Sequence, residues 1–340
     1  MFDRLFKRRG SGQETARALN PEHAIRVTLD ELINLRMQAR HLSLHSNLPA
    51  THVMSGNHIS HFKGRGMDYM ESRIYQAGDD IRNMDWRVTA RTGQPHIKLF
   101  QEERQRPVMM MLDYNPGMFF ASQGRFKSVV ASQAAALLAW SALNNGDRVG
   151  GLIINHGHEE IADQVGKKGI LALLHAIEKH SNPHEYLHEY LQAHPTATHR
   201  PSDSERFSEG LQRLVRMSRP GSLVFVFSDF YQLDPAAIKQ LSLLKQHCDC
   251  VLIRLSDPLE TTPPPANRYA VSNGKQQVII NTANHQQAEH YQQWFGSHQQ
   301  QLRDVTRKLA MPLIELSTAQ PPLDTLRKHF SLRTRGKSSR

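Results

Sequence analysis

The segment Val108-Met-Met-Met-Leu-Asp-Tyr-Asn-Pro-Gly-Met118 decides the fold class of this 340-residue chain. Its first five residues are all apolar, which is typical of a strand that is buried on both faces in the middle of a parallel sheet. The apolar run stops at Asp113, and Asn115, Pro116 and Gly117 then predict a turn that leads into a helix. Open α/β sheets bind ligands at this position, beyond the carboxyl end of a central strand. Asp113 is therefore the first candidate site residue.

Strand and helix patterns alternate along the chain after this segment. The predicted strands are 108–112, 148–155, 223–227, 250–255 and 311–316, and the predicted helices are 125–143, 170–180, 208–217, 235–246 and 284–310. Residues 159–162 are expected to pair with the sheet, and Asn273-Gly274 between apolar runs predicts a hairpin. This alternation implies right-handed crossovers. We therefore expect an α/β, Rossmann-like fold with a mostly parallel sheet and helices on both faces.

Four parts are expected along the chain. Residues 1–20 and 331–340 are polar and basic and are predicted to be tails, the first of them disordered. Residues 106–330 form the α/β domain, with the hairpin and C-terminal helices. Residues 21–105 form a smaller N-terminal extension with a helix and β-strands, in which Thr28-x-x-Glu31 fits a capping box.

The net charge of +10 is concentrated in the two tails. Residues 1–10 contribute +3 and residues 327–340 contribute +6, which leaves +1 for the rest of the chain. A nucleic-acid-binding domain should carry basic charge on its folded surface, so this distribution argues against nucleic acid as a partner. Weak contact of the tails with acidic lipids or RNA is an alternative role for them.

Composition also predicts a cytoplasmic protein. The longest apolar runs are far shorter than the roughly 20 residues that span a bilayer, and the basic start of the chain has no apolar region after it, unlike a secretory signal. Cys248 and Cys250 are separated by one residue, a poor spacing for a disulfide and too few ligands for zinc. We expect them to be small residues at the start of a strand.

The densest charged motif lies between residues 73 and 91, where four arginines, three aspartates, a tyrosine and a tryptophan occur within nineteen residues. Its members are Arg73, Tyr75, Gly78, Asp79, Asp80, Arg82, Asp85, Trp86, Arg87 and Arg91. One interpretation is a recognition surface or an acid–base site, since arginine pairs with carboxylates and tryptophan offers a face for stacking. The other, which we favour, is a structural network in which the opposite charges satisfy one another and hold the segment on the sheet.

Motifs for common enzyme chemistry are absent from the sequence. There is no GxxxxGK[ST] phosphate loop, no G-x-G-x-x-G after a strand and no G-x-S-x-G elbow. Two strands instead end in an aspartate, at Asp113 and Asp229, and parallel strands would bring these carboxylates to one edge. Carboxylates at such an edge suit Mg²⁺ or Mn²⁺, although an aspartate at a strand end is also a frequent helix cap.

The spaced motifs resemble the signature of the bacterial "domain of unknown function 58" family. They are the 73–91 motif, Pro95-x-x-Lys98, Gly146-Asp147-Arg148-Val149-Gly150, Ser228-Asp229-Phe230 and Asp257-Pro258-x-Glu260. The resemblance covers roughly residues 50–330. That family is similar to von Willebrand factor type A domains, which carry a metal-ion-dependent adhesion site at the carboxyl edge of the sheet. Its members are commonly encoded beside MoxR-type AAA+ ATPases. The resemblance thus implies a partner-binding adaptor and no reaction.

An adhesion site of that type has the pattern Asp-x-Ser-x-Ser, a threonine from a later loop and a further aspartate. Asp113 and Asp229 match the two acids, Asn115 replaces the first serine and Gly117 replaces the second. The loop 166–169 offers two lysines where a threonine would be needed. The resemblance therefore implies a degenerate site, with Asp113, Asn115 and Asp229 as its ligands and weak affinity for Mg²⁺ or Mn²⁺.

Three hypotheses follow. The leading one is a cytoplasmic, non-enzymatic adaptor that works with a MoxR-type AAA+ ATPase in the assembly or activation of a client complex. In it, residues 73–91 would brace an extra β-layer against the domain, and the edge with Asp113 and Asp229 would face the partner. The alternative is a Mg²⁺-dependent binder or hydrolase that uses Asp113, Asn115 and Asp229. The third is association with RNA or lipid through the tails. The client complex and the oligomeric state stay open.

Overall fold

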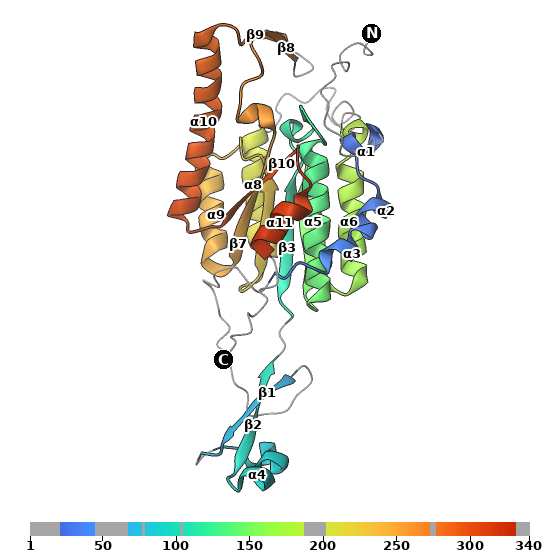
Figure 1. Cartoon of the computed structure of the whole chain (residues 1–340), viewed down its shortest axis with the longest axis vertical. Helices are drawn as coiled ribbons and strands as arrows, with labels where there is room; N and C mark the ends of the chain where they lie inside the picture. Colours follow the sequence, from blue (N-terminus) through green and yellow to red (C-terminus); the bar gives the residue numbers. More distant parts are fainter. Residues whose placement is uncertain are drawn as a thin grey trace, which may run out of the picture.

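The structure is a computed structural model of the whole chain, and it describes residues 21–44, 67–76, 79–102, 105–186, 202–272 and 277–330. The two predicted tails, residue Gly78 of the charged motif and the Asn-Gly turn of the predicted hairpin lie outside these residues. The described chain contains an α/β body and a separate hairpin arm (Figure 1).

The body is built on one six-stranded sheet with the strand order β10-β7-β6-β3-β4-β5. The strands are β3 (Pro107–Asp113), β4 (Arg148–Ile154), β5 (His158–Val165), β6 (Leu223–Ser228), β7 (Asp249–Ser256) and β10 (Leu313–Ser317). Neighbouring strands are parallel except β5, which runs antiparallel to β4 at one edge. The prediction of a mostly parallel sheet with Val108–Leu112 near its centre is confirmed.

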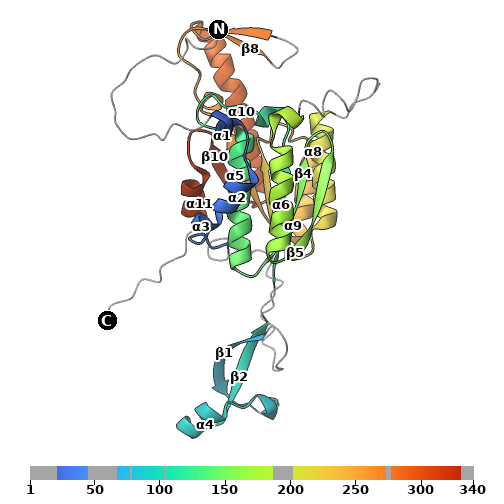
Figure 2. The ribbon, with the colours of Figure 1, turned by 90° about the vertical axis from the view of Figure 1, so that its right-hand side faces the viewer.

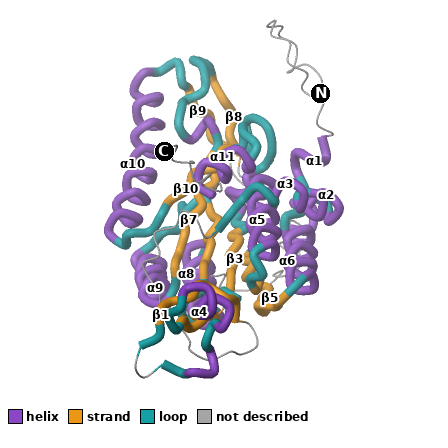
Figure 3. Tube along the Cα trace, turned by 60° about the horizontal axis from the view of Figure 1, so that its bottom comes forward, coloured by secondary structure: helices purple, strands orange, loops and turns teal. Residues whose placement is uncertain are grey.

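Helices cover both faces of the sheet, as predicted (Figure 3). One face carries α5 (Lys127–Asn144), α6 (Lys167–His180), α2 (Leu29–Asn34), α3 (Arg36–Ala39) and α11 (Pro322–Phe330), with α1 (Pro21–Ile25) beside α5. The other face carries α8 (Asp203–Met217), α9 (Pro235–His247) and α10 (His285–Lys308). The small hairpin of β8 (Arg268–Ser272) and β9 (Gln277–Asn281) precedes α10.

Helix α5 is the central helix of the body, and Lys127–Ala142 is buried along its whole length. Its many alanines let the helix pack closely on the strands and let α2, α3, α6 and α11 cover its outer side. Thr28 caps α2 by accepting a hydrogen bond from the amide of Glu31, which is one half of the predicted capping box, whereas the Glu31 carboxylate accepts from Gln133 Nε2 at 2.6 Å. The N-terminal helices therefore belong to the body.

The order of the strands places a topological switch between β3 and β6. From β3 the chain continues to β4 on one side, whereas β6 pairs with the other side of β3. At such a point the loops after the two strands diverge and leave a crevice at the carboxyl edge. The loops after Asp113 and Ser228 are the ones that meet there.

The arm consists of β1 (Met67–Ile74) and β2 (His96–Glu102), which are antiparallel, and of η1 (Ile81–Asn83) and α4 (Trp86–Thr92) between them. It projects from the end of the body where the parallel strands begin, opposite to their carboxyl edge (Figures 1 and 2). Asp85 caps α4 by accepting from the amide of Val88, and Gly93 ends the helix with a φ of 73°. The expectation that this segment braces a layer against the sheet is wrong, because the arm projects away from the body and the bonds described for Ser72, Arg73, Asp79 and Asp85 join residues of the arm to one another (Figure 1).

In the described part of the chain, no helix combines the length and the apolar character that a membrane span requires. Cys248 and Cys250 are free and buried at the end of α9 and the start of β7. They are small buried residues, as the sequence predicts.

Candidate functional site

The loop after β3 forms the first wall of the site. Asp113 and Asn115 are buried, and the side-chain oxygen of Asn115 accepts from the amide of Gly117 at 2.8 Å. This bond caps the short helix η2 (Pro116–Met118), which the Asn-Pro-Gly sequence favours because proline suits the first turn of a helix. The hydroxyl of Tyr114 is anchored on Ser132 of α5 at 2.7 Å. The loop is thus fixed by its own sequence.

The loop after β6 forms the second wall. The hydroxyl of Ser228 donates to Asp113 Oδ2 at 2.6 Å and accepts from the amide of Phe230 at 3.0 Å. Phe230 has a φ of 60°, a left-handed conformation that is a genuine outlier for a bulky side chain. Its buried ring packs edge-on against Phe207 of α8, which helps to hold this conformation. Strain of this kind is found where structure over-determines a functional turn.

Asn115 joins the two walls. Its amide nitrogen lies 3.0 Å from Asp113 Oδ2 and 3.1 Å from Asp229 Oδ1. The structure therefore brings together Asp113, Asn115 and Asp229, the three residues that the sequence predicts at this edge.

Sequence reasoning missed the cation of the site, Lys127. The side chain of Lys127 is only 2% exposed, and its ammonium nitrogen lies 3.6 Å from Asp229 Oδ2. The same nitrogen forms an ion pair with Glu260 Oε1. One signal was available, because Lys127 is the only charged residue between 126 and 146. Nothing in the sequence shows that its partners lie more than one hundred residues away.

Glu260 is held in place by the Asp257-Pro258-x-Glu260 motif. Asp257 caps η3 (Pro258–Glu260), and Glu260 Oε2 accepts from the amide of Asp257 in return. Asp257 also accepts from the hydroxyls of Ser122 and Thr318, at 2.5 and 2.7 Å. The motif thus links three loops and presents one carboxylate to Lys127.

Burial changes the protonation of the acids at this edge. Desolvation raises the pKa of Asp113 to about 7, and the nearby charge of Asp229 adds to the rise, while the hydrogen bond from Ser228 opposes it. Burial also raises the pKa of Glu260 above its ordinary value, against the opposing effect of Lys127. Lys127 is the cation that pairs with Asp229 and Glu260 at this edge.

The positions of the side chains around Asp113 and Asp229 show whether a divalent cation fits between these two carboxylates. Asn115 turns its NH₂ group, which cannot ligate a metal, toward both carboxylates, and its oxygen is occupied by Gly117. A Cβ added at Gly117 would lie 2.7 Å from Asp229 Oδ2, so a serine in this position has no room. The described residues also hold no group of three or more His, Cys, Asp or Glu side chains arranged to bind a metal. Asp229 Oδ2 is buried and accepts no hydrogen bond from the described residues, and its ion-pair partner is the Lys127 ammonium at 3.6 Å. Because Asn115 presents its NH₂ group and Gly117 has no side chain, a divalent cation does not fit this donor set.

Aromatic side chains of α10 and of the loop after β6 cover the charged groups of the site. Tyr231 stacks on Trp294 and His298 of α10, with ring centroids 5.5 and 4.0 Å apart, and the ammonium of Lys127 lies 5.7 Å from the centre of the Tyr231 ring. His298 Nε2 is 3.2 Å from the carbonyl oxygen of Asp229, and burial lowers the pKa of His298. Trp294 keeps 55% of its surface exposed. The charged groups are therefore buried, and an aromatic surface covers them.

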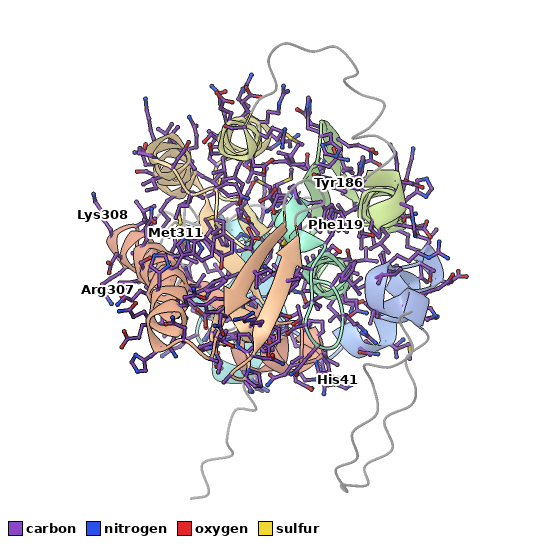
Figure 4. All side chains as sticks on the ribbon, turned by 90° about the horizontal axis from the view of Figure 1, so that it is seen from above. His41, Phe119, Tyr186, Arg307, Lys308 and Met311 are labelled. Carbon is purple, nitrogen blue, oxygen red and sulfur yellow. The ribbon has the colours of Figure 1, made fainter. Side chains whose placement is uncertain are left out.

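A second aromatic contact holds the β3 loop from the opposite side. Phe119 and Tyr186 lie next to each other, with ring centroids 4.7 Å apart (Figure 4), and Tyr186 also packs on His156 at 4.0 Å. A groove of about 710 Å³ lies elsewhere, beside α2 and the residues that join β10 to α11. None of its lining residues is Asp113, Asn115, Lys127 or Asp229. The carboxyl edge is a closed polar cluster, and the groove belongs to another part of the body.

The motif at 73–91 is not part of this site. Its described residues lie on the arm, whereas the carboxylates lie at the far end of the sheet (Figure 1). The arm's three aspartates have local partners, of which only Arg73 is an arginine of the motif. Asp79 pairs with Arg73 at 2.7 Å, Asp80 caps η1, and Asp85 accepts from Ser72 at 2.7 Å. The hydrogen bond from Ser72 holds the pKa of Asp85 below its ordinary value.

Comparison with known proteins identifies the family. The DUF58 family, described as a protein family of unknown function, matches residues 71–301, and the chain belongs to it. Uncharacterized proteins of Mycobacterium bovis and Mycobacterium tuberculosis are each 23% identical over 321 residues, which cover 94% of this chain and 95% of theirs. These relatives carry no assigned activity.

Two solved structures resemble parts of this chain. A conserved hypothetical protein, BatB, from Bacteroides thetaiotaomicron is 12% identical, with a TM-score of 0.35, and the match covers 60% of this chain and 98% of that one. An aerotolerance-related membrane protein from Bacteroides fragilis is also 12% identical, with a TM-score of 0.37 and coverage of 66% and 98%. The likeness is too low for either to inform the site.

Proposed function

We propose that this protein is a non-catalytic, cytoplasmic adaptor that binds protein partners through the carboxyl edge of its sheet and works with a MoxR-type AAA+ ATPase. The observation that carries the proposal is the buried ammonium of Lys127 between Asp229 and Glu260. An enzyme of the alternative kind would need carboxylates free to act on a ligand or a metal. Here Asp229 and Glu260 are paired with an ammonium from within the chain.

The surface above this cluster supports a binding role. Trp294 is more than half exposed and rests on Tyr231, whose loop carries the strained Phe230. Tryptophan is among the residues that contribute most to protein interfaces, and a rigid support lowers the entropy lost on binding. The polar cluster would then hold the loops in the geometry that presents Trp294.

The chain belongs to the DUF58 family, and the choice of partner class rests on the expectation from the sequence motifs that members of this family are encoded beside MoxR-type ATPases. An ATPase that remodels a client needs an adaptor with at least two contact surfaces. The carboxyl edge supplies one such surface on the body. The identity of the client complex has to come from experiment.

The proposal is tested by affinity purification of the full chain from its native organism in the presence of ATP. We expect an AAA+ ATPase to be recovered with the wild-type protein and severalfold less of it with Trp294→Ala. Leu171→Ala is the matched control, because Leu171 is an exposed apolar residue on α6, away from the edge. Repeated purification without any AAA+ ATPase, or equal recovery with Trp294→Ala, would contradict the proposal.

A further inference from the structure

The arm has a surface that the proposed function does not use, and its composition is unusual. Three of the nine large apolar side chains that are exposed in the described part of the chain lie between residues 74 and 86. They are Ile74, Ile81 and Trp86, which are 54%, 61% and 68% exposed. Exposed apolar groups gathered in this way mark interaction sites, whereas single ones need no explanation.

Arginines outnumber aspartates around these apolar groups, four to three within residues 73–91. The three aspartates of the motif serve within the arm, where they pair with Arg73 and cap η1 and α4. Arg82, Arg87 and Arg91 are exposed, and no ion pair joins any of them to another described residue. Arg87 and Arg91 are four residues apart on α4 and therefore share one face of the helix. The tip of the arm thus exposes three guanidinium groups that have no ion-pair partner among the described residues, and an exposed tryptophan lies in the same short segment, residues 82–91.

We infer that this surface, defined by Ile81, Arg82, Trp86, Arg87 and Arg91, is a docking site for an acidic segment of a partner protein. Charge complementarity specifies the partner, because guanidinium groups pair bidentately with carboxylates. Trp86 and Ile81 require that the segment also carries an apolar side chain. Tryptophan and arginine are the residues most enriched among those that dominate binding energy.

A nucleic acid is the less suitable occupant. Proteins that bind single strands place several aromatic residues along a basic groove, whereas the described arm exposes one tryptophan beside two isoleucines. The exposed acid Glu71 lies on β1, three residues before Ile74, so the basic surface is confined to the tip of the arm. A small patch with an apolar centre matches a short peptide segment.

The inference is independent of the proposed function, since it concerns the opposite end of the molecule. Its test places the photo-cross-linking residue p-benzoylphenylalanine at Ile81 of the full chain in the native organism, with Ile279 as the control position. Ile279 is equally exposed, at 66%, but lies on β9. The cross-linked segment is sequenced, synthesised and titrated against the purified chain.

We expect an adduct from position 81 on a protein segment rich in Asp and Glu, and none on the same segment from position 279. The affinity of the synthetic peptide should fall at least tenfold with Trp86→Ala and with the double variant Arg87→Glu, Arg91→Glu. It should stay within twofold with Lys167→Glu, Lys168→Glu, a charge reversal at an exposed helix start on the body. Replacement of the peptide's acids by amides should cause a similar loss.

Several results would overturn the inference. They are the absence of an adduct from position 81, an adduct with nucleic acid, an adduct with a second copy of this chain, and an adduct with a segment that has no net negative charge. Equal peptide affinity for the wild type and the arm variants would also overturn it. Recovery of an AAA+ ATPase through Trp294 could still succeed, so failure here is distinguishable from failure of the proposed function.

Discussion

The two ends of this molecule treat charge in opposite ways. At the carboxyl edge the acids Asp113, Asp229 and Glu260 are buried, and the buried Lys127 pairs with Asp229 and Glu260. At the tip of the arm the acids form an ion pair or cap helices within the arm, and arginines are exposed to solvent. A buried cluster whose groups bond mainly to one another fixes loop geometry, although Asp229 Oδ2 accepts no hydrogen bond from the described residues, whereas exposed charges are available to another molecule. The comparison therefore assigns a mainly structural role to one set of charges and a recognition role to the other.

The largest expected effect comes from removing the buried cation. Lys127→Met leaves Asp229 and Glu260 buried without their partner, and loss of one member of a buried pair costs about 3–5 kcal/mol of unfolding free energy. Urea denaturation measures the loss. The control Lys168→Met removes an exposed lysine and should change stability by no more than about 0.5 kcal/mol. Equal, small losses in both variants would mean that Lys127 does not balance the cluster.

The second prediction concerns pH and Asp113. Its folded pKa of about 7 lies above its ordinary value near 4, so the folded state keeps a proton that the unfolded state has released. The stability that this proton provides is complete below pH 4 and is lost as pH rises through 7. Each pH unit between the two pKa values corresponds to about 1.4 kcal/mol, so the loss of stability is at most roughly 4 kcal/mol.

Asp113→Asn isolates this effect, because the amide keeps an oxygen that can accept from Ser228 and Asn115 but has no proton to lose. The wild type should lose stability relative to this variant between pH 4.5 and 7.5, as measured by urea denaturation at each pH. Parallel pH profiles for the two proteins would show that Asp113 is ionised throughout that range and would contradict the account.

A smaller loss is expected when the missing serine of an adhesion site is restored. In Gly117→Ser the new Cβ meets Asp229 Oδ2 at 2.7 Å, and such overpacking typically costs about 1–3 kcal/mol. Gly296→Ser on α10 is the matched control, since nothing lies within 4 Å of its added Cβ. The loss of stability is measured by thermal denaturation of both variants. A Gly117→Ser protein as stable as the control would mean that the carboxyl edge of the sheet has room for the added side chain.

The smallest change in stability is expected on the arm. Trp86 is 68% exposed, so Trp86→Ala should alter the unfolding free energy by no more than about 0.5 kcal/mol while it weakens binding of the acidic segment. Urea denaturation and peptide titration of the same sample separate the two effects. A loss above roughly 2 kcal/mol would assign Trp86 to the fold and remove the contrast between the two ends.

Sequence patterns predict much of the body because its elements are strongly periodic. Val108–Leu112 marks the central strand, and the convergence of Asp113 with Asp229 follows from parallel strands alone. The pairing of Lys127 with Glu260 does not follow, because a lysine at the start of a helix usually faces solvent. Its burial depends on the turn at Pro258, more than one hundred residues away.

The arm shows a second limit of such patterns. The motif at 73–91 predicts internal charge pairing, and Arg73 with Asp79 confirms part of it. The sequence does not indicate whether the pairing joins the segment to the sheet or stays within a hairpin. That depends on how far the strands β1 and β2 extend beyond the body, which local periodicity does not specify.

Calorimetric titration of Mg²⁺ and Mn²⁺ into the wild type and Asp113→Ala at pH 8 tests most directly whether the carboxyl edge carries its own cation. At this pH Asp113, whose pKa is about 7, is ionised, so the conditions favour a metal. The account predicts no saturable heat with either protein, because the ammonium of Lys127 and the amide of Asn115 already hold the acids. Saturable heat in the wild type that disappears in Asp113→Ala would contradict it.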